Sequence, residues 1–169
     1  MVKRKPIVAA GLVVLAGIAA VFYLFPSEEK RVRRQFDLLS QYAAKEPGED
    51  PFSTANRIRN LSGLFAERCE FKIEGEALYS LSGSYSRQDV AGYALRGRSY
   101  FSDLSLTFPD LKVRFPEKGS ARVRFTAKLK GRSTTGEAVD ETREFQCVLN
   151  RIGKKWLFST LEAVEVLKR

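Results

Sequence analysis

The sequence contains no histidine and only two cysteines among its 169 residues. Histidine is the commonest general base, metal ligand and pH-sensitive group in proteins, so its absence argues against many catalytic and metal sites. Cys69 and Cys147 lie far apart and form no Cys-x-x-Cys pair, which excludes a zinc site or a thioredoxin-like motif of ordinary spacing. We therefore expect neither a metal ion nor a cofactor.

Charge is present in a modest positive excess. The chain has 29 Lys and Arg residues against 20 Asp and Glu, a net charge of +9, and residues 3–5 hold three of the cations. An excess of this kind favours anionic lipid headgroups or an acidic partner when it is more than a solvated surface. No block of Lys and Arg with interleaved aromatic residues occurs, so we expect no nucleic-acid partner.

Residues 7–25 form an uncharged apolar run, IVAAGLVVLAGIAAVFYLF. A helix of this length spans close to the roughly 30 Å hydrocarbon core of a bilayer. Phe22, Tyr23 and Phe25 fall at its far end, where an aromatic belt would lie. The sequence therefore predicts a membrane anchor over residues 1–26 and a separate domain over residues 27–169.

The alternative to an anchor is a cleaved signal peptide. Its apolar region would be shorter and would end in a small-x-small cleavage site. This run ends in the bulky residues Phe-Tyr-Leu-Phe-Pro, and Ala19-Ala20 lies inside it, so we favour the uncleaved anchor.

Basic residues flank the run on both sides, which leaves the positive-inside count nearly balanced. The short basic tail before the run is typical of a signal anchor. We therefore expect a cytoplasmic N-terminus and a domain outside the cytoplasm, on the periplasmic face of the inner membrane if the organism is bacterial.

The rest of the chain reads as helices followed by long strands. The first helix has its apolar residues at spacings of four, three and four, and the second is expected to be capped by Ser53 or Thr54. Period-two alternation marks the strands, with a bulge or kink expected at Pro109-Asp110. Helices are predicted over residues 28–45, 54–67 and 86–101, and strands over 69–74, 77–81, 104–115, 122–130, 142–149 and 156–167.

This order of elements, over residues 28–167, resembles the NTF2-like (SnoaL-like) superfamily. Two motifs add to the resemblance: the capping-box-like helix start Ser86-Arg-Gln-Asp89 and the closing strand entry Gly153-Lys-Lys-Trp156-Leu-Phe158. The resemblance implies an α+β cone, in which a curved antiparallel sheet packs on about three helices and leaves a pocket at its open end. It also implies a homodimer, because members of the family often pair their sheets.

Enzymes of this superfamily use a pocket Asp, often with Tyr or His, and other members only bind or assemble. The candidates here are Asp103, Tyr93 and Tyr100, because a tyrosine can donate to a developing oxyanion while a carboxylate acts as base. Tyr93 and Tyr100 are seven residues apart and share a helix face. We favour the structural alternative, in which both tyrosines pack the helix on the sheet and Asp103 lies in a surface turn.

Two further sets of residues have both a binding and a structural interpretation. An apolar pocket would be lined by Phe65, Tyr93, Phe125, Phe145, Trp156 and Phe158, which we expect instead to form the core. An anion-binding stripe would consist of Arg122, Arg124, Lys128 and Lys130, for which we favour cross-strand pairing. A hairpin centred near Thr134-Thr135 places Lys130 opposite Asp140, and Lys128 beside Thr142 and diagonal to Glu144.

The two cysteines also leave two alternatives open. Both fall on predicted inward faces of strands, so outside the cytoplasm Cys69 and Cys147 would form a disulfide if their strands were neighbours. Free buried cysteines are equally ordinary core residues.

These observations favour a non-catalytic function. We expect a membrane-anchored, extracytoplasmic domain that binds a partner protein or an apolar ligand. The alternatives are a small-molecule isomerase or lyase working by Tyr/Asp acid–base chemistry, and a carrier of lipid or hydrophobic metabolites.

Overall fold

The computed structural model describes residues 27–73 and 80–164. The chain divides into two compact units, residues 1–31 and 32–169, and the sheet with its core belongs to the second unit. The predicted anchor lies outside the described residues. Among the residues that the structure describes, no helix is both long enough and apolar enough to cross a membrane.

The described residues contain three helices, α2 (Glu28–Ala43), α3 (Pro51–Ser62) and α4 (Arg87–Tyr100). α2 buries Val32, Phe36 and Ala43, which belong to the face predicted from the apolar spacing. α4 begins with the predicted capping box, because the Ser86 hydroxyl accepts a hydrogen bond from the Asp89 N–H and the Asp89 carboxylate accepts one from the Ser86 N–H.

The prediction for the second helix was wrong at both ends. The N-cap is Asp50, whose carboxylate accepts hydrogen bonds from the N–H groups of Phe52 and Ser53. Hydrogen bonds from the Ser53 side chain and backbone lower the pKa of this carboxyl. Pro51 opens the helix, because proline suits the first position of a helix, whose N–H has no partner in any case. The helix stops at Ser62 because the chain turns directly into a strand.

Six strands form one sheet in the order β2-β1-β6-β5-β4-β3. Their bounds are β1 (Phe65–Ile73), β2 (Leu81–Ser86), β3 (Phe101–Glu117), β4 (Ser120–Ser133), β5 (Ala138–Ile152) and β6 (Lys155–Ala163). β3 to β6 form consecutive antiparallel hairpins, as predicted, but β6 lies parallel to β1. The sheet is therefore mixed rather than wholly antiparallel.

Smaller corrections concern the first hairpin. β1 begins at Phe65, four residues before the predicted start, and its antiparallel partner is β2 rather than residues 77–81. Residues 77–79 of that predicted strand lie outside the described residues.

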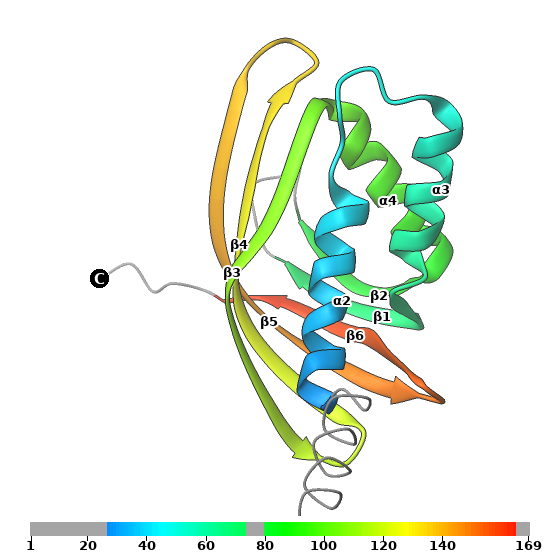
Figure 1. Cartoon of the computed structure of the whole chain (residues 1–169), viewed down its shortest axis with the longest axis vertical. Coiled ribbons are helices and arrows are strands. Elements are labelled where there is room, and N and C mark those ends of the chain that lie inside the picture. Colours follow the sequence, from blue (N-terminus) through cyan, green and yellow to red (C-terminus); the bar gives the residue numbers. More distant parts are fainter. Residues whose placement is uncertain (1–26, 74–79, 165–169) are drawn as a thin grey trace, which may run out of the picture. The chain divides into compact units, whose positions relative to one another are not determined.

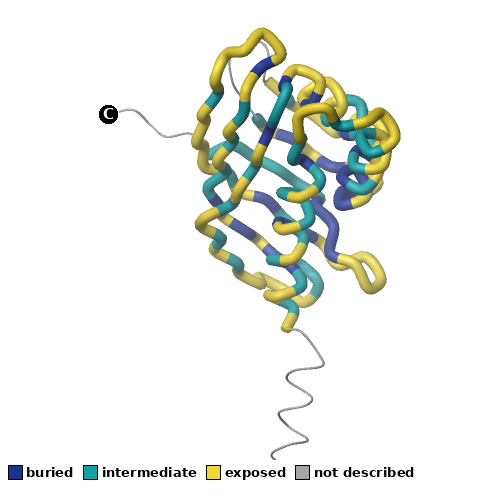
Figure 2. The backbone as a smooth tube through the Cα atoms, turned by 45° about the horizontal axis from the view of Figure 1, so that its top comes forward, coloured by how far each residue is buried: buried dark blue, intermediate teal, exposed yellow. Residues whose placement is uncertain are grey.

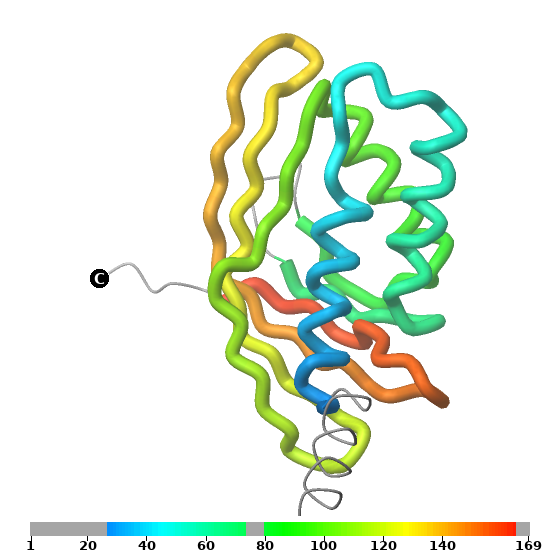
Figure 3. Tube along the Cα trace, viewed as in Figure 1, coloured from blue at the N-terminus to red at the C-terminus, as the bar shows by residue number. Residues whose placement is uncertain are grey.

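The long strands bend, and the bend curves the sheet around the helices. The pairing of β3 with β4 shifts register between Thr107 and Asp110, at the predicted bulge around Pro109. Figure 3 shows β3, β4 and β5 turning sharply partway along their length. In Figure 1 the helices lie on the inner side of this curve.

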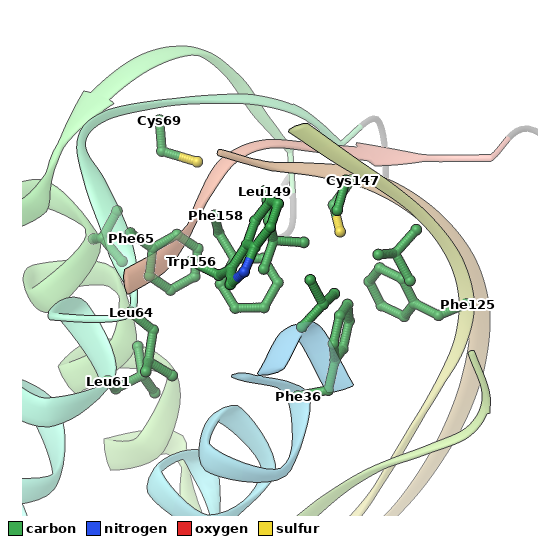
Figure 4. Packing of buried hydrophobic residues seen from close by; sticks show 14 of the residues in the cluster. Phe36, Leu61, Leu64, Phe65, Cys69, Phe125, Cys147, Leu149, Trp156 and Phe158 are labelled. Atoms are coloured by element: carbon green, nitrogen blue, oxygen red, sulfur yellow. The ribbon is translucent and has the colours of Figure 1, made fainter. Parts of the chain in front are cut away.

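The inner side of the curve is filled by aromatic side chains, with Phe36 of α2 at the centre. Its ring centroid lies 5.3 Å from that of Phe108, 5.0 Å from Phe125 and 5.2 Å from Phe158, each in an edge-to-face arrangement. Figure 4 shows Phe36 pointing from α2 towards the sheet, and Figure 2 shows buried positions alternating with exposed ones along the strands. Phe36 is 1% exposed, so it is a core residue and lines no open space.

Replacing Phe36 with Ala is expected to lower the free energy of unfolding by about 3–5 kcal/mol, because three aromatic neighbours lose a contact and a cavity remains. Phe52 offers a matched control, since it is 83% exposed and Phe52→Ala should change stability by about 0.5 kcal/mol or less. Denaturant unfolding followed by the fluorescence of Trp156, the single tryptophan, measures both variants. Similar losses for the two variants would contradict the central position of Phe36.

Candidate functional site

The six residues proposed to wall an apolar pocket do not line a common cavity. Phe65 contacts Phe158, and Phe125 stacks on Phe145 at 5.7 Å, and these four belong with Trp156 to one packed cluster, so five of the six are core residues. Trp156 is 2% exposed and packs against Phe115. Tyr93 lies apart from them, with 38% of its surface exposed.

The Tyr/Asp candidates are not brought together either. Tyr93 contacts the ring of Tyr85 and carries the Arg96 guanidinium 4.6 Å above its own ring. Tyr100, at the end of α4, is 46% exposed and contacts Phe101. Burial raises the pKa of the neighbouring phenol of Tyr85.

Asp103 lies in strand β3 rather than in the surface turn that we expected. The Ser102 hydroxyl donates a hydrogen bond of 3.1 Å to its Oδ2. Asp103 lines a hollow of about 400 Å³ together with Lys45, Lys130 and Asp140. A second hollow, of about 490 Å³, lies between α3, β1 and the start of α4 and is bordered by Glu67, Arg68 and Arg87, among others. Both hollows are wide open to solvent and bordered by charged side chains.

Cys69 and Cys147 are free thiols buried in the core. They lie on β1 and β5, and β6 runs between these two strands, so the neighbouring strands that a disulfide requires are absent. Figure 4 shows the two sulfur atoms as separate, unbonded thiols. Burial raises the pKa of the Cys69 thiol to about 12 and raises that of Cys147 as well, which keeps both in the unreactive thiol form.

A buried cluster of charged residues joins the three helices. The side chains of Glu49 and Arg98 are 5% and 4% exposed and form an ion pair, and Arg57 Nε lies 3.0 Å from the other Glu49 oxygen. Desolvation lowers the pKa of Arg98, while Glu49 opposes that shift. No periodic signal in the sequence marks this cluster, because Glu49 lies in a loop.

The Arg98 guanidinium also closes the C-terminal end of α2. Its Nη1 donates to the carbonyl oxygens of Tyr42, at 2.9 Å, and Ala43, at 2.8 Å, and also to that of Ala44. These carbonyls have no partner within the helix, and a cation suits the negative end of the helix dipole. In return Lys45 Nζ donates to the carbonyl of Arg98, at 3.1 Å. The cluster therefore has a structural role.

The predicted anion stripe divides into two parts. Lys130 lies opposite Asp140, with 3.1 Å between the charged atoms, and Lys128 lies opposite Thr142. Both pairs were predicted from a hairpin centred near Thr134-Thr135. Arg124 forms an exposed ion pair of 3.4 Å with Glu144. Pairing with β5 therefore accounts for Lys130 and Arg124, but it leaves Arg122 opposite Val148.

On its other side, β4 places like charges opposite each other. Arg114 of β3 is paired in register with Arg122, and Lys112 with Arg124, and all four are exposed. Like charges directly opposite each other destabilise a sheet. Among the described residues, Arg114 and Arg122 have no ion-pair partner, while Lys112 has only the exposed Asp110 at 3.6 Å. The sequence does carry a signal for Lys112 and Arg114, because register counting across the turn at residues 116–119 places them beside Arg124 and Arg122.

A second turn extends this charged surface. The Arg151 N–H donates to the Gly119 carbonyl at 2.8 Å, so the β5–β6 turn lies beside the β3–β4 turn. We call residues 110–124 and 150–155 together the basic tip. Its Lys and Arg residues are Lys112, Arg114, Lys118, Arg122, Arg124, Arg151, Lys154 and Lys155.

The basic tip accounts for the whole net positive charge of the domain. It contains eight Lys and Arg residues against two acidic ones, Asp110 and Glu117. When residues 3–5 are also set aside, the remaining 18 cations of the chain face 18 acidic residues. No group of three or more Cys, Asp or Glu residues gathers in metal-binding geometry within residues 27–73 and 80–164. Of the sites predicted from the sequence, only this charged surface is assembled, in an altered form.

No protein-family model matches the sequence, and no curated protein matches it. Solved structures do match, at low identity. A candidate association domain of calcium/calmodulin-dependent protein kinase II from Xanthomonas campestris has a TM-score of 0.63 and 15% identity, over 85% of this chain and 91% of that one. A candidate NTF2-like dehydratase from Streptomyces avermitilis has a TM-score of 0.62 and 14% identity, over 84% and 99%.

The hexachlorocyclohexane dehydrochlorinase LinA type 2 is a further match, with a TM-score of 0.61 and 13% identity, over 82% of this chain and 84% of that one. At these identities the likeness defines the fold alone. The described residues thus have an NTF2-like fold, as the sequence resemblance predicted. Proteins with this fold include named enzymes and a named association domain, so the fold does not select an activity.

Replacing Glu49 with Gln should lower the free energy of unfolding by about 3–5 kcal/mol, because it leaves the buried Arg98 guanidinium without its counter-charge. The matched control is Glu46→Gln, an exposed site in the same loop, where a change within about 0.5 kcal/mol is expected. Urea unfolding of both variants provides the comparison. If the two substitutions cost the same, the buried ion pair does not hold the helices together.

Proposed function

We propose that this chain is a membrane-anchored NTF2-like domain that acts outside the cytoplasm by binding a partner protein, without catalysing a reaction. The anchor is residues 7–25, and the domain is residues 27–169. The single observation that carries the non-catalytic part is the filled interior of the cone. Phe36 occupies the space between the curved sheet and the helices, where the family resemblance implies a ligand pocket.

The sequence supports the anchor. Nineteen residues without a charge precede the domain, with Lys3, Arg4 and Lys5 on one side and aromatic residues at the other end. Lys3, Arg4 and Lys5 before the run favour the orientation with the domain outside, because positive charge favours the cytoplasmic side. In such a location the partner is a protein of the membrane or envelope, including a second copy of this chain.

The same packing counts against the two alternatives. A carrier of lipids or hydrophobic metabolites needs an apolar cavity, whereas the two hollows are open and bordered by charged groups. An isomerase or lyase would need a tyrosine beside Asp103, whereas Tyr93 packs against Tyr85 and Arg96. If Asp103 were nevertheless the base, Asp103→Asn would abolish turnover without unfolding the protein.

Native mass spectrometry of the full-length protein, gently extracted from its own membrane, tests both parts of the proposal. The mass of the chain is expected to include residues 1–26, because an uncleaved anchor stays attached. A stoichiometric protein partner, or a homodimer, is expected to remain bound. A chain cut near residue 26 would disprove the anchor, and a retained small molecule without a protein partner would disprove the protein-binding function.

Protease protection tests the proposed topology separately. A membrane-impermeant protease added to intact spheroplasts is expected to digest the domain, because residues from 27 onward face away from the cytoplasm. Inverted membrane vesicles should protect the same residues. The opposite pattern would place the domain in the cytoplasm and leave the anchor itself unaffected.

A further inference from the structure

The basic tip has features that the proposed function does not use. Arg114 faces Arg122, and Lys112 faces Arg124, across two strands that would be more stable with opposite charges there. An arrangement that weakens the fold is retained more readily when an anionic partner offsets the repulsion. The surface is also separate from the hollows and from the buried ion pair of Glu49.

Two exposed apolar side chains lie in the same two turn regions as these cations. Phe115 is 42% exposed and Ile152 is 55% exposed, and they belong to the two adjacent turns that form the tip. Phe115 packs against the buried Trp156 and leaves less than half of its surface to solvent. Exposed apolar residues at the same end of a domain as Lys and Arg are typical of surfaces that lie in the headgroup region of a bilayer, where the apolar groups enter the lipid and the cations meet its phosphates.

The chain itself limits how far the tip can lie from the membrane. Arg33 Nη2 donates to the carbonyl of Leu111, at 3.1 Å, so the early part of α2 touches the tip. Phe25, the last residue of the predicted span, precedes Arg33 by eight residues. Eight residues reach at most about 29 Å when fully extended, and about 12 Å when helical. An anchored chain therefore leaves the tip within reach of the headgroups, without itself determining whether the tip rests on them.

We propose that the basic tip docks on the anionic headgroups of the membrane that holds the anchor, and so fixes the orientation of the domain on the bilayer. This inference rests on the proposed anchor. The ligand chemistry is a lipid phosphate in a surface, recognised by guanidinium and ammonium groups, with Phe115 and Ile152 entering the interface. The remainder of the domain, whose charges balance, is left free for a partner protein.

The test uses the full chain in nanodiscs, with a fluorophore on one introduced cysteine and a quencher on the lipid headgroups. Ser120→Cys places the fluorophore in the tip, and Thr134→Cys places it in the turn at the other end of β4, as Figure 1 shows. The native thiols, Cys69 and Cys147, are buried and remain unlabelled. Discs contain either phosphatidylcholine alone or a mixture with phosphatidylglycerol.

In phosphatidylglycerol discs, quenching at position 120 is expected to exceed quenching at position 134. The difference should be lost in phosphatidylcholine and also near 1 M salt, where the Debye length falls to about 3 Å. The double variant Arg114→Gln/Arg122→Gln should lose it too. The matched control Lys128→Gln/Lys130→Gln removes two cations from the same exposed face of β4, away from the tip, and should keep it.

Two results would overturn the inference, and they are distinguishable from each other. If the chain does not co-purify with the discs, the anchor is disproved and the docking inference fails with it. If the chain co-purifies but quenching at position 120 is the same in both lipid mixtures, the anchor stands and lipid docking is disproved. An acidic protein would then be the remaining candidate for the tip.

Discussion

One buried guanidinium sets the position of the helices on the sheet. Arg98 donates to the last carbonyls of α2 from a side chain on α4, and its charge is balanced by Glu49 in the loop that leads to α3. A cation with so little solvent contact remains in place only while every partner does. The direction of α2 follows from this constraint, because the closed end of the helix cannot move away from α4. Phe36 is thereby held inside the curve of the sheet.

Because of the same constraint, the interior of this domain is filled, whereas the family resemblance implies a cone with an open pocket. With Phe36 fixed against Phe125 and Phe158, the interior is a core rather than a pocket. What remains available for recognition is the outside of the molecule, and its charge is distributed unevenly. The basic tip concentrates the positive excess at one end, while the rest of the chain beyond the N-terminal cations is neutral on balance. Electrostatics of this kind orient a molecule before it makes any specific contact.

Local patterns in the sequence predicted most of the helices and strands. They did not predict contacts between segments that are far apart in the sequence. The capping box at Ser86 and the pairing of Lys130 with Asp140 involve residues that are close in sequence or joined by one turn. Counting residue positions along the chain was therefore sufficient to predict both. The parallel contact of β6 with β1 joins distant segments that share no turn, and no periodicity encodes it. For the candidate site, the like-charged pairs were within reach of register counting, whereas the buried position of Glu49 depends on how three helices meet.

The position of β6 has a consequence for how the protein is made. This strand is the last in sequence, yet it lies between β1 and β5 and joins the two halves of the sheet. Until it has been synthesised, β1–β2 and β3–β5 are separate pieces with open edges, and contacts of such long range also form slowly. A chain that emerges N-terminus first therefore cannot join the two parts of this sheet until β6 has been made. Until β6 is present, the facing edges of β1 and β5 stay open to wrong pairing, which exposes the growing chain to aggregation.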